Sequence, residues 1–478
     1  MFPVTICTLG CKLNQVESEA IVDSFKKAGF TILPWTTKLD GPGIVIINTC
    51  TVTSKADQKT RMFVRKALRQ NPASCVIVTG CYAKLDPKEI ESLEADAAPE
   101  GGAAYGTVAG VRRLFVPHRG EGSVGADKSA LLGLPEYIRR ATLQGDDLFG
   151  AMELWVSRQD GGEGSGTKGD PFGFRPGEFT FHSRGYLKVQ DGCDNTCTYC
   201  RTRFARGPSI SLPVQAALAE VRSLEEKGCA ELTIAGVNII QYWHSGFNLA
   251  GLVECLLEGS GTIALRLSSL EPEGITDELA SVLAHPRVRP HFHLSVQSGS
   301  DSVLRKMGRT YEAGAVEEAV ALLRSAKDRP FLACDIISGF PGETESDFEL
   351  TLALCEKIGF AWIHSFPYSP RPGTPASSFD GHVHEWEVKR RADILTKLAW
   401  QGRREYTKAW IGRELSAVVE KGQRWGRQCH AVSENYLKLI VNCKDMNPAP
   451  GSSIRCTPVS LCIGANGENP DAFARISV

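Results

Sequence analysis

The sequence lacks the features of a membrane-spanning or a secreted protein. No run of about 18 uncharged apolar residues occurs in the 478 residues, so we expect no membrane span. The N-terminus, MFPVTICTLGCK, has neither the basic start nor the long apolar stretch of a signal peptide. We therefore expect the protein to be cytoplasmic and to have no membrane partner.

The net charge leaves nucleic-acid binding undecided, whereas the modest cysteine content argues against a disulfide-rich protein. The formal net charge is −1, which gives no overall indication of nucleic-acid binding, although local basic patches can still provide it. The 16 cysteines are too few for a disulfide scaffold in a chain of this length, and a reducing compartment favours free thiols and metal sites. The length and the apolar content of 42% suit roughly two to four globular domains.

The first part of the chain, 1–119, alternates between strand and helix patterns. Its β-branched runs VTICTLGC, GIVIINTC and SCVIVTGC are separated by helical patterns, which predicts parallel βαβ units. Residues 120–180 are rich in glycine and show little periodicity, so we expect a linker or an insertion there.

Residues 181–410 alternate again. Their strand-like runs are RGYLKVQDG, AELTIAGVNI, ALRLSSLEP, HFHLSVQSGS, FLACDIISGF and AWIHSFPYS. Six βα units predict an open barrel, two units short of a closed one, with its chemistry at the C-terminal ends of the strands. This part ends in a basic helical stretch, Glu385 to Trp410, which either contacts phosphates or forms a salt-bridged face.

Residues 411–478 contain short β-rich pieces separated by turns, as in a small barrel. The fold class is therefore α/β. It combines an N-terminal parallel α/β domain, an open (βα)6 barrel and a small C-terminal β-barrel.

Three cysteines of the first domain, Cys11, Cys50 and Cys81, each end one of its strand runs. Parallel strands place their C-terminal ends at one edge of a sheet, so these distant residues are expected to converge there. Asn14 opens a helix just after Cys11, and the positive helix end would favour an anionic thiolate-bound cluster. The alternative is three buried structural cysteines.

A second group of cysteines lies in the stretch GCDNTCTYC. Cys193, Cys197 and Cys200 follow the first barrel strand in a C-x-x-x-C-x-x-C spacing, which suits three corners of a 4Fe-4S cube. A structural zinc loop is the alternative, but no nearby residue completes its ligand set. Three cysteines leave one iron open, as catalytic metal sites leave a position for substrate.

The stretch CDNTCTYC resembles the signature of the radical S-adenosylmethionine (SAM) enzymes. The series TLGCKLNQVESEA, INTCTVT, TGCYAK, FARG, SVQSGSD, GFPGETESDF and FPYSPRPGTPA resembles the methylthiotransferases among them, over most of the chain apart from about 96–180. Within that family, TLGCKLNQVESE is most similar to the MtaB branch, which acts on N6-threonylcarbamoyladenosine beside the tRNA anticodon.

The resemblance implies methylthiolation at carbon 2 of that base, with SAM and two 4Fe-4S clusters as cofactors. Cys193, Cys197 and Cys200 would hold the cluster that binds and reduces SAM, and Cys11, Cys50 and Cys81 the cluster that delivers sulfur. The implied partners are the tRNA anticodon loop, an electron donor such as flavodoxin or ferredoxin, and a sulfur donor.

The resemblance also implies contact residues. For SAM they are Tyr199, Gly236, Ser295, Gln297, Gly339 and Glu343, each with an ordinary packing or turn role as the alternative. The C-terminal segment resembles the RNA-binding TRAM module. Its Arg424, Trp425 and Arg427 combine charge with an aromatic ring, which suits phosphate contact and base stacking unless the loop is simply solvated.

Two arginines depart from the family pattern. Arg201 and Arg203 stand where the family usually has apolar residues and proline, which could alter substrate contact. Two alternatives for function stay open. The enzyme could methylthiolate another tRNA adenosine or a ribosomal protein aspartate, or the chain could be a non-catalytic iron-sulfur or zinc protein that binds RNA.

Overall fold

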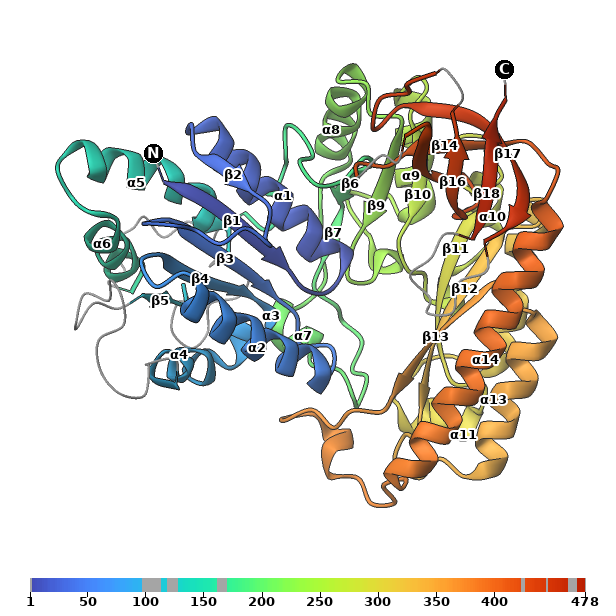
Figure 1. Ribbon diagram of the computed structural model, residues 1–478. Helices are drawn as coiled ribbons and strands as arrows, with labels where there is room; N and C mark the ends of the chain where they lie inside the picture. The colour runs from blue at the N-terminus through green and yellow to red at the C-terminus, as the bar shows by residue number, and fades with distance from the viewer. Residues whose placement is uncertain are drawn as a thin grey trace. The chain divides into compact units, whose positions relative to one another are not determined.

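The computed structural model describes residues 2–96, 113–117, 128–160, 170–422, 426–443, 446–462 and 471–477 (Figure 1). Its internal contacts divide the chain into two compact units. Unit 1 contains Met1–Thr180, Asp191–Cys193 and Cys200–Pro208, and unit 2 contains Phe181–Gln190, Asp194–Tyr199 and Ser209–Val478. The loop with the second cysteine group therefore contributes residues to both units.

Unit 1 is built on a parallel sheet in the order β2-β1-β3-β4-β5, which confirms the predicted parallel α/β fold. The strands are β1 (Pro3–Thr8), β2 (Thr31–Leu33), β3 (Ile44–Thr49), β4 (Cys75–Gly80) and β5 (Leu114–Phe115). The helices are α1 (Lys12–Lys27), α2 (Ser54–Gln70), α3 (Cys81–Leu85), α4 (Pro87–Asp96), α5 (Leu134–Leu143), α6 (Leu148–Asp160) and α7 (Thr202–Arg206).

The sheet of unit 1 is buried on both faces. Its central strands are apolar almost throughout, as parallel strands covered by helices usually are. Alternate residues of β3 point to opposite faces: Ile44 and Ile46 pack in the core with α1, α5 and α6, and Val45 and Ile47 pack in the core with α2, α3 and α4.

Part of the stretch 120–180, which we expected to be a linker or an insertion, is helical. Helices α5 and α6 place Ile138, Leu148, Met152 and Trp155 in the same core as residues of β1 and α1. Burying these apolar side chains offsets the entropy of ordering this stretch, so it is an integral part of unit 1. The proposed domain boundaries themselves stay a prediction.

Unit 2 contains all six predicted barrel strands. They form two parallel sheets in the orders β10-β9-β6 and β11-β12-β13, and a parallel bridge joins Leu270 to Leu294. The strands are β6 (Gly185–Lys188), β9 (Glu231–Ala235), β10 (Ala264–Leu267), β11 (His291–Gln297), β12 (Phe331–Ser338) and β13 (Trp362–Pro367). The open (βα)6 prediction is confirmed.

The helices of unit 2 alternate with these strands. They are α8 (Val214–Glu226), α9 (Leu249–Gly259), α10 (Asp277–Leu283), α11 (Asp301–Lys306), α12 (Ala313–Ala326), α13 (Glu345–Ile358) and α14 (Glu385–Trp410). Two short strands, β7 (Gln190–Asp191) and β8 (Ile210–Ser211), flank the cysteine loop.

The C-terminal segment of unit 2 is a closed barrel in the order β14-β15-β16-β18-β17, as predicted. Its strands are β14 (Leu415–Val419), β15 (Gln428–Ser433), β16 (Lys438–Asn442), β17 (Ser453–Leu461) and β18 (Ala472–Ile476). The barrel has its own apolar core, to which Tyr406 and Trp410 of α14 add their rings. Among the helices described, none is long and apolar enough to cross a bilayer.

Candidate metal centres

Cys11, Cys50 and Cys81 stand at the C-terminal ends of β1, β3 and β4, which are neighbours in the sheet of unit 1. Cys11 is exposed at the N-cap of α1, Cys81 is half-buried at the start of α3, and Cys50 between them is buried. The sheet therefore brings three thiols that are distant in sequence to one edge, as expected from the parallel topology.

Two glycines permit this close approach. Gly10 and Gly80 directly precede Cys11 and Cys81, and both have positive φ, at 104° and 102°. A Cβ at Gly10 would lie 2.5 Å from the Cβ of Cys50, and one at Gly80 would lie 2.5 Å from the backbone nitrogen of Thr49. Both the backbone conformation and the space therefore require glycine. Sequence reasoning missed this role, although both glycines stand beside the cysteines it selected.

The electrostatics of the thiols depend on how close they are. Burial, with a smaller contribution from nearby Cys11 and Cys81, raises the pKa of the Cys50 thiol to about 12, although the backbone N–H of Val52 and the positive charge of Arg206 oppose the rise. Without metal the Cys50 thiol is therefore protonated at neutral pH, and binding of a metal cluster would displace its proton.

The spacing of the sulfur atoms bears on which metal group fits. Three thiolates on a single zinc ion would lie within about 4 Å of one another, because each Zn–S bond is about 2.3 Å. The sulfur atoms of Cys11, Cys50 and Cys81 are not all within 4.8 Å of one another. The three thiols are therefore not arranged compactly enough here to hold one zinc ion, and their assignment to a 4Fe-4S cluster stays a prediction.

Arg206 carries a buried positive charge beside this edge of unit 1. Its side chain is 8% exposed, and its guanidinium donates to Glu17 Oε1 at 3.0 Å, Asp191 Oδ1 at 3.0 Å and Asn14 Oδ1 at 3.0 Å. Lys128 forms a second ion pair with Glu17. These charged groups hold α1 and α7 together next to the thiols.

Asn14 has a different local role from the one we expected. Helix α1 begins at Lys12 with Cys11 as its N-cap, so Asn14 does not open the helix. Instead, its Nδ2 donates to the carbonyl oxygens of Leu9 at 2.7 Å and Thr49 at 2.9 Å. These bonds join the ends of β1 and β3 and so set the separation of Cys11 and Cys50.

Cys193 and Cys200 belong to unit 1 together with the first cysteine group. The backbone nitrogen of Cys193 donates to Gly207 O at 3.1 Å, and a Cβ on Gly192 would collide with Pro208 O. The backbone nitrogen of Thr202 donates to Cys200 Sγ at 3.3 Å.

Arg201, the residue after Cys200, makes a further contact within unit 1. Its side chain is buried and pairs with Asp86, which follows α3, at 2.9 Å. It therefore ties the cysteine loop to unit 1. Arg203 is exposed.

Cys197 belongs to unit 2, where a buried arginine contacts it. Arg309 Nη1 donates to Cys197 Sγ at 3.2 Å, and the same guanidinium pairs with Glu271 and reaches Ser295 O at 3.3 Å. The backbone nitrogen of Thr198 donates to Met307 O at 2.9 Å. Arg309 is a cysteine-contacting residue that the sequence did not reveal.

Four of the residues expected to contact SAM belong to unit 2, Tyr199 in the cysteine loop and the other three at or after barrel strands. Tyr199 packs edge-on against Phe340, with ring centroids 6.4 Å apart. A Cβ at Gly236 would lie 3.0 Å from the Cβ of Gln190, which explains the glycine by packing. Ser295 accepts from Tyr311 through its carbonyl, and Gln297 is buried with a φ of 64° at the end of β11. Their contact with SAM stays a prediction.

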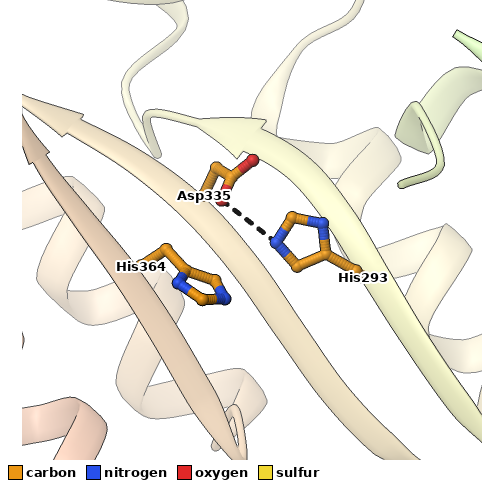
Figure 2. Close-up of side chains that lie close together, drawn as sticks. All are labelled: His293, Asp335 and His364. Atoms are coloured by element: carbon orange, nitrogen blue, oxygen red, sulfur yellow. Dashed lines mark hydrogen bonds and ion pairs between the residues drawn. The ribbon is translucent and has the colours of Figure 1, made fainter. Parts of the chain in front are cut away.

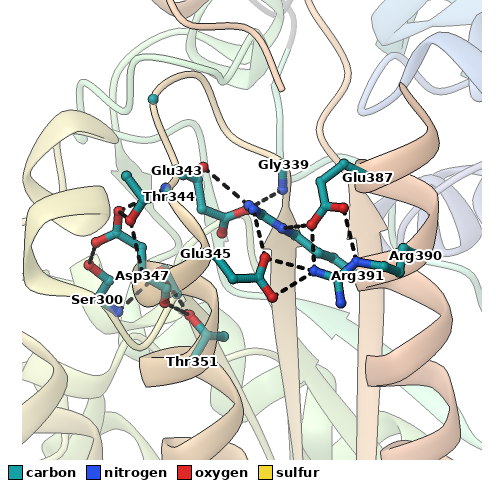
Figure 3. Close-up of polar contacts among 12 residues, drawn as sticks. Ser300, Gly339, Glu343, Thr344, Glu345, Asp347, Thr351, Glu387, Arg390 and Arg391 are labelled. Atoms are coloured by element: carbon teal, nitrogen blue, oxygen red, sulfur yellow. Dashed lines mark hydrogen bonds and ion pairs between the residues drawn. The ribbon is translucent and has the colours of Figure 1, made fainter. Parts of the chain in front are cut away.

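Gly339 and Glu343 belong to a polar network (Figure 3). Glu343 Oε2 accepts from Gly339 N at 2.6 Å and from Arg391 Nη1 at 2.7 Å. Burial raises the pKa of the Glu343 carboxyl, although both donors oppose the shift. These bonds give Glu343 a structural role in joining the turn to α14, and its contact with SAM also stays a prediction.

One further donor set lies on neighbouring strands of unit 2. His293, Asp335 and His364 place ligand atoms within 4.8 Å of one another, the only such group in the part of the chain that the structure describes (Figure 2). His293 Nε2 lies 3.0 Å from Asp335 Oδ1, and Trp362 Nε1 donates to His364 Nδ1 at 3.2 Å. The indole donor places the proton of a neutral His364 on Nε2, so these bonds describe a hydrogen-bonded array, and we assign no metal to it.

Of the residues expected to contact RNA, Arg424 and Trp425 lie outside the described residues. Arg427 is exposed just before β15, and its carbonyl accepts from Cys443 N at 2.9 Å. Its role in RNA binding stays a prediction.

Comparisons with family models match two parts of the chain. Residues 187–355 match the radical SAM superfamily, and residues 3–98 match the uncharacterized protein family UPF0004. Among solved structures, a cobalamin-binding radical SAM methyltransferase, TsrM from Kitasatospora setae, is 15% identical with a TM-score of 0.49, over 79% of this chain and 77% of that one.

Curated relatives match nearly the whole chain. A threonylcarbamoyladenosine tRNA methylthiotransferase MtaB of Treponema pallidum is 38% identical, covering 95% of this chain and 98% of that protein. The MtaB of Thermotoga maritima is 36% identical over 88% and 87%. A tRNA-2-methylthio-N(6)-dimethylallyladenosine synthase of Anaplasma marginale is 31% identical over 88% and 85%. The chain belongs to the radical SAM methylthiotransferase family.

Proposed function

We propose that this enzyme methylthiolates carbon 2 of N6-threonylcarbamoyladenosine adjacent to the anticodon of tRNA, giving the 2-methylthio derivative. The observation that carries the choice of nucleoside is the match to the Treponema relative, which covers 95% of this chain and 98% of that protein. The Thermotoga and Bacillus subtilis relatives bear the same name, at 36% and 30% identity.

We assign one 4Fe-4S cluster to Cys11, Cys50 and Cys81, and a second, SAM-binding cluster to Cys193, Cys197 and Cys200. Enzymes of this family use SAM and 4Fe-4S clusters. When bound, these groups supply electron transfer to SAM and a site for sulfur. The convergence of the first group at one sheet edge and the open spacing of the second support the assignment.

The protein's own residues hold the reacting groups in place. Arg201 and Arg206 attach the loop of Cys193 and Cys200 to the unit that carries the other three cysteines. Such fixed placement matters because well-oriented groups can gain effective molarities of about 10⁵ to 10⁸ M. Arg309, by contrast, anchors Cys197 in unit 2 and sets the hydrogen bonding of its sulfur.

A loop nucleotide is a suitable substrate, because carbon 2 of adenine is hidden by pairing in a duplex. The anticodon loop exposes it without the cost of opening a helix. The reaction also needs an external electron donor, such as flavodoxin or ferredoxin, and a sulfur donor. We propose that it takes place in the cytoplasm, where tRNA is modified.

Mass spectrometry of nucleosides from tRNA treated anaerobically with reconstituted enzyme, SAM, sulfide and a reductant tests the proposal. We expect the 2-methylthio derivative of threonylcarbamoyladenosine, and no product with tRNA from cells that lack the threonylcarbamoyl group. If only dimethylallyladenosine is methylthiolated, the enzyme has instead the activity that the name of the Anaplasma relative gives. Modification of a ribosomal protein instead of tRNA would overturn the proposal.

A further inference from the structure

Helix α2 presents one strongly basic face. The helix follows Cys50 by a short turn, and Thr53 caps it by accepting from Ala56 N at 3.2 Å. Val64, Ala67 and Leu68 are buried against the sheet of unit 1. The opposite face forms a surface hollow lined by Gln58, Arg61, Met62, Arg65, Lys66, Arg69 and Gln70.

Helix α2 carries a large excess of positive over negative side chains. Its sequence, SKADQKTRMFVRKALRQ, holds six cationic residues and one acid, Asp57, which is buried. Arg61 pairs with Glu89 at 2.9 Å. Lys66 and Arg69 are exposed and form no ion pair with any residue that the structure describes.

Helix α14, the basic stretch selected from sequence, differs in this respect. It carries acidic residues of its own, and four of its seven cations form ion pairs, some of them shown in Figure 3. The pairs are Arg390 with Glu345 and Glu387, Arg391 with Glu343, Glu345 and Glu387, Arg403 with Asp471, and Lys408 with Glu405. A salt-bridged face therefore describes these four cations, and phosphate contact by Lys389, Lys397 and Arg404 stays a prediction.

We infer that the basic face of α2, from Gln58 to Gln70, is a binding surface for the phosphate backbone of the substrate RNA. The face is about 18 Å long at 1.5 Å per residue, which spans several phosphates of one strand. Lysine and arginine give sequence-independent phosphate contacts that position a nucleic acid, and glutamines at both ends add hydrogen-bond donors. Met62 is the exposed apolar side chain of this face, so the face lacks the apolar stripe of a membrane-binding helix.

The location of the face fits a positioning role. It lies on unit 1, on the helix that begins just after Cys50. Bound RNA would therefore be held by the same unit as the cysteines proposed to deliver sulfur. This inference rests on the proposed function, because it requires an RNA substrate.

The double variant Lys66→Gln/Arg69→Gln tests the surface in the full-length, reconstituted enzyme. A matched control is Lys26→Gln/Lys38→Gln, which removes two exposed cations of the same unit that likewise form no ion pair with any described residue. We expect tRNA affinity to fall roughly ten-fold in the test variant, and the slope of log K against log salt to fall by about 1.4, or 0.7 per lost contact. The control should change both much less.

Formation of 5′-deoxyadenosine without tRNA, measured on the same samples, checks that fold and clusters are intact. If wild-type enzyme binds tRNA and the test variant retains the wild-type affinity and slope, the inference is wrong. If wild-type enzyme does not bind tRNA, the proposed function fails instead. Binding to anionic phospholipid vesicles that is lost in the test variant, with tRNA binding unchanged, would assign the face to a membrane surface and overturn the inference.

Discussion

The two cysteine groups are built in opposite ways. Cys193, Cys197 and Cys200 come from one short loop, whereas Cys11, Cys50 and Cys81 come from the ends of neighbouring strands. The cost of closing a chain segment rises with its length, so the loop set can gather around a metal before the fold is complete. The strand-end set needs the finished sheet and its register. One site therefore depends on spacing and the other on topology.

The largest expected effect comes from removing single cysteines. Cys200→Ala should abolish both 5′-deoxyadenosine formation and methylthiolation, because it removes a ligand of the proposed SAM-binding cluster. Cys11→Ala should abolish methylthiolation alone, because it affects only the strand-end set. Chromatography of deoxyadenosine and mass spectrometry of the nucleoside, from the same anaerobic reactions, measure both. Methylthiolation at the wild-type rate by Cys11→Ala would disprove this division of roles.

Iron content tests whether the two groups load independently. After anaerobic reconstitution we expect about eight irons per chain, and about four after replacing either cysteine group completely. A triple variant that loses all iron would show instead that the groups depend on each other. Near-stoichiometric zinc with only traces of iron would contradict both cluster assignments.

Replacing single glycines by alanine should perturb the two cysteine groups separately, because each glycine packs beside one group. Gly80→Ala should distort the strand-end group and Gly192→Ala the loop group, since each added Cβ meets backbone atoms at a positive φ. We expect each to lower the free energy of unfolding by about 1–3 kcal/mol and to reduce iron by about half, at different clusters. Gly145→Ala is the control, with a φ of 99° and nothing within 4 Å of its Cβ. If Gly145→Ala loses as much stability and iron as the two test variants, the effect comes from backbone strain at positive φ alone.

The smallest expected effect concerns Arg309. Arg309→Gln removes a charged donor from Cys197 Sγ, and loss of such groups around a metal ligand typically costs about ten-fold in affinity or activity. We expect slower deoxyadenosine formation and a lower reduction potential of the loop cluster, read by electron paramagnetic resonance during a redox titration. The signal of the strand-end cluster should stay at its wild-type potential. A shift of both signals would indicate a general change of fold.

Much of the architecture was readable from local patterns. The βα alternation predicted the parallel sheet of unit 1 and all six barrel strands, because hydrophobic period and turn residues are local properties. Helix α14 matches the predicted Glu385 to Trp410 in full. The stretch 120–180 was harder, because its glycine-rich ends concealed the apolar pattern of α5 and α6, whose burial depends on the sheet they cover.

The sequence by itself determined which residues we propose to carry the chemistry: the cysteine spacing of the loop and the cysteines at the strand ends are both visible in the chain. Only the tertiary structure decided what surrounds them. Arg206 and Arg309 lie far in sequence from most of their partners, and Gly10 and Gly80 are required because another strand's backbone or side chain fills the space of a Cβ. The physical reason is that ligand identity is a property of single residues, whereas charge pairing and close packing arise only when distant segments meet.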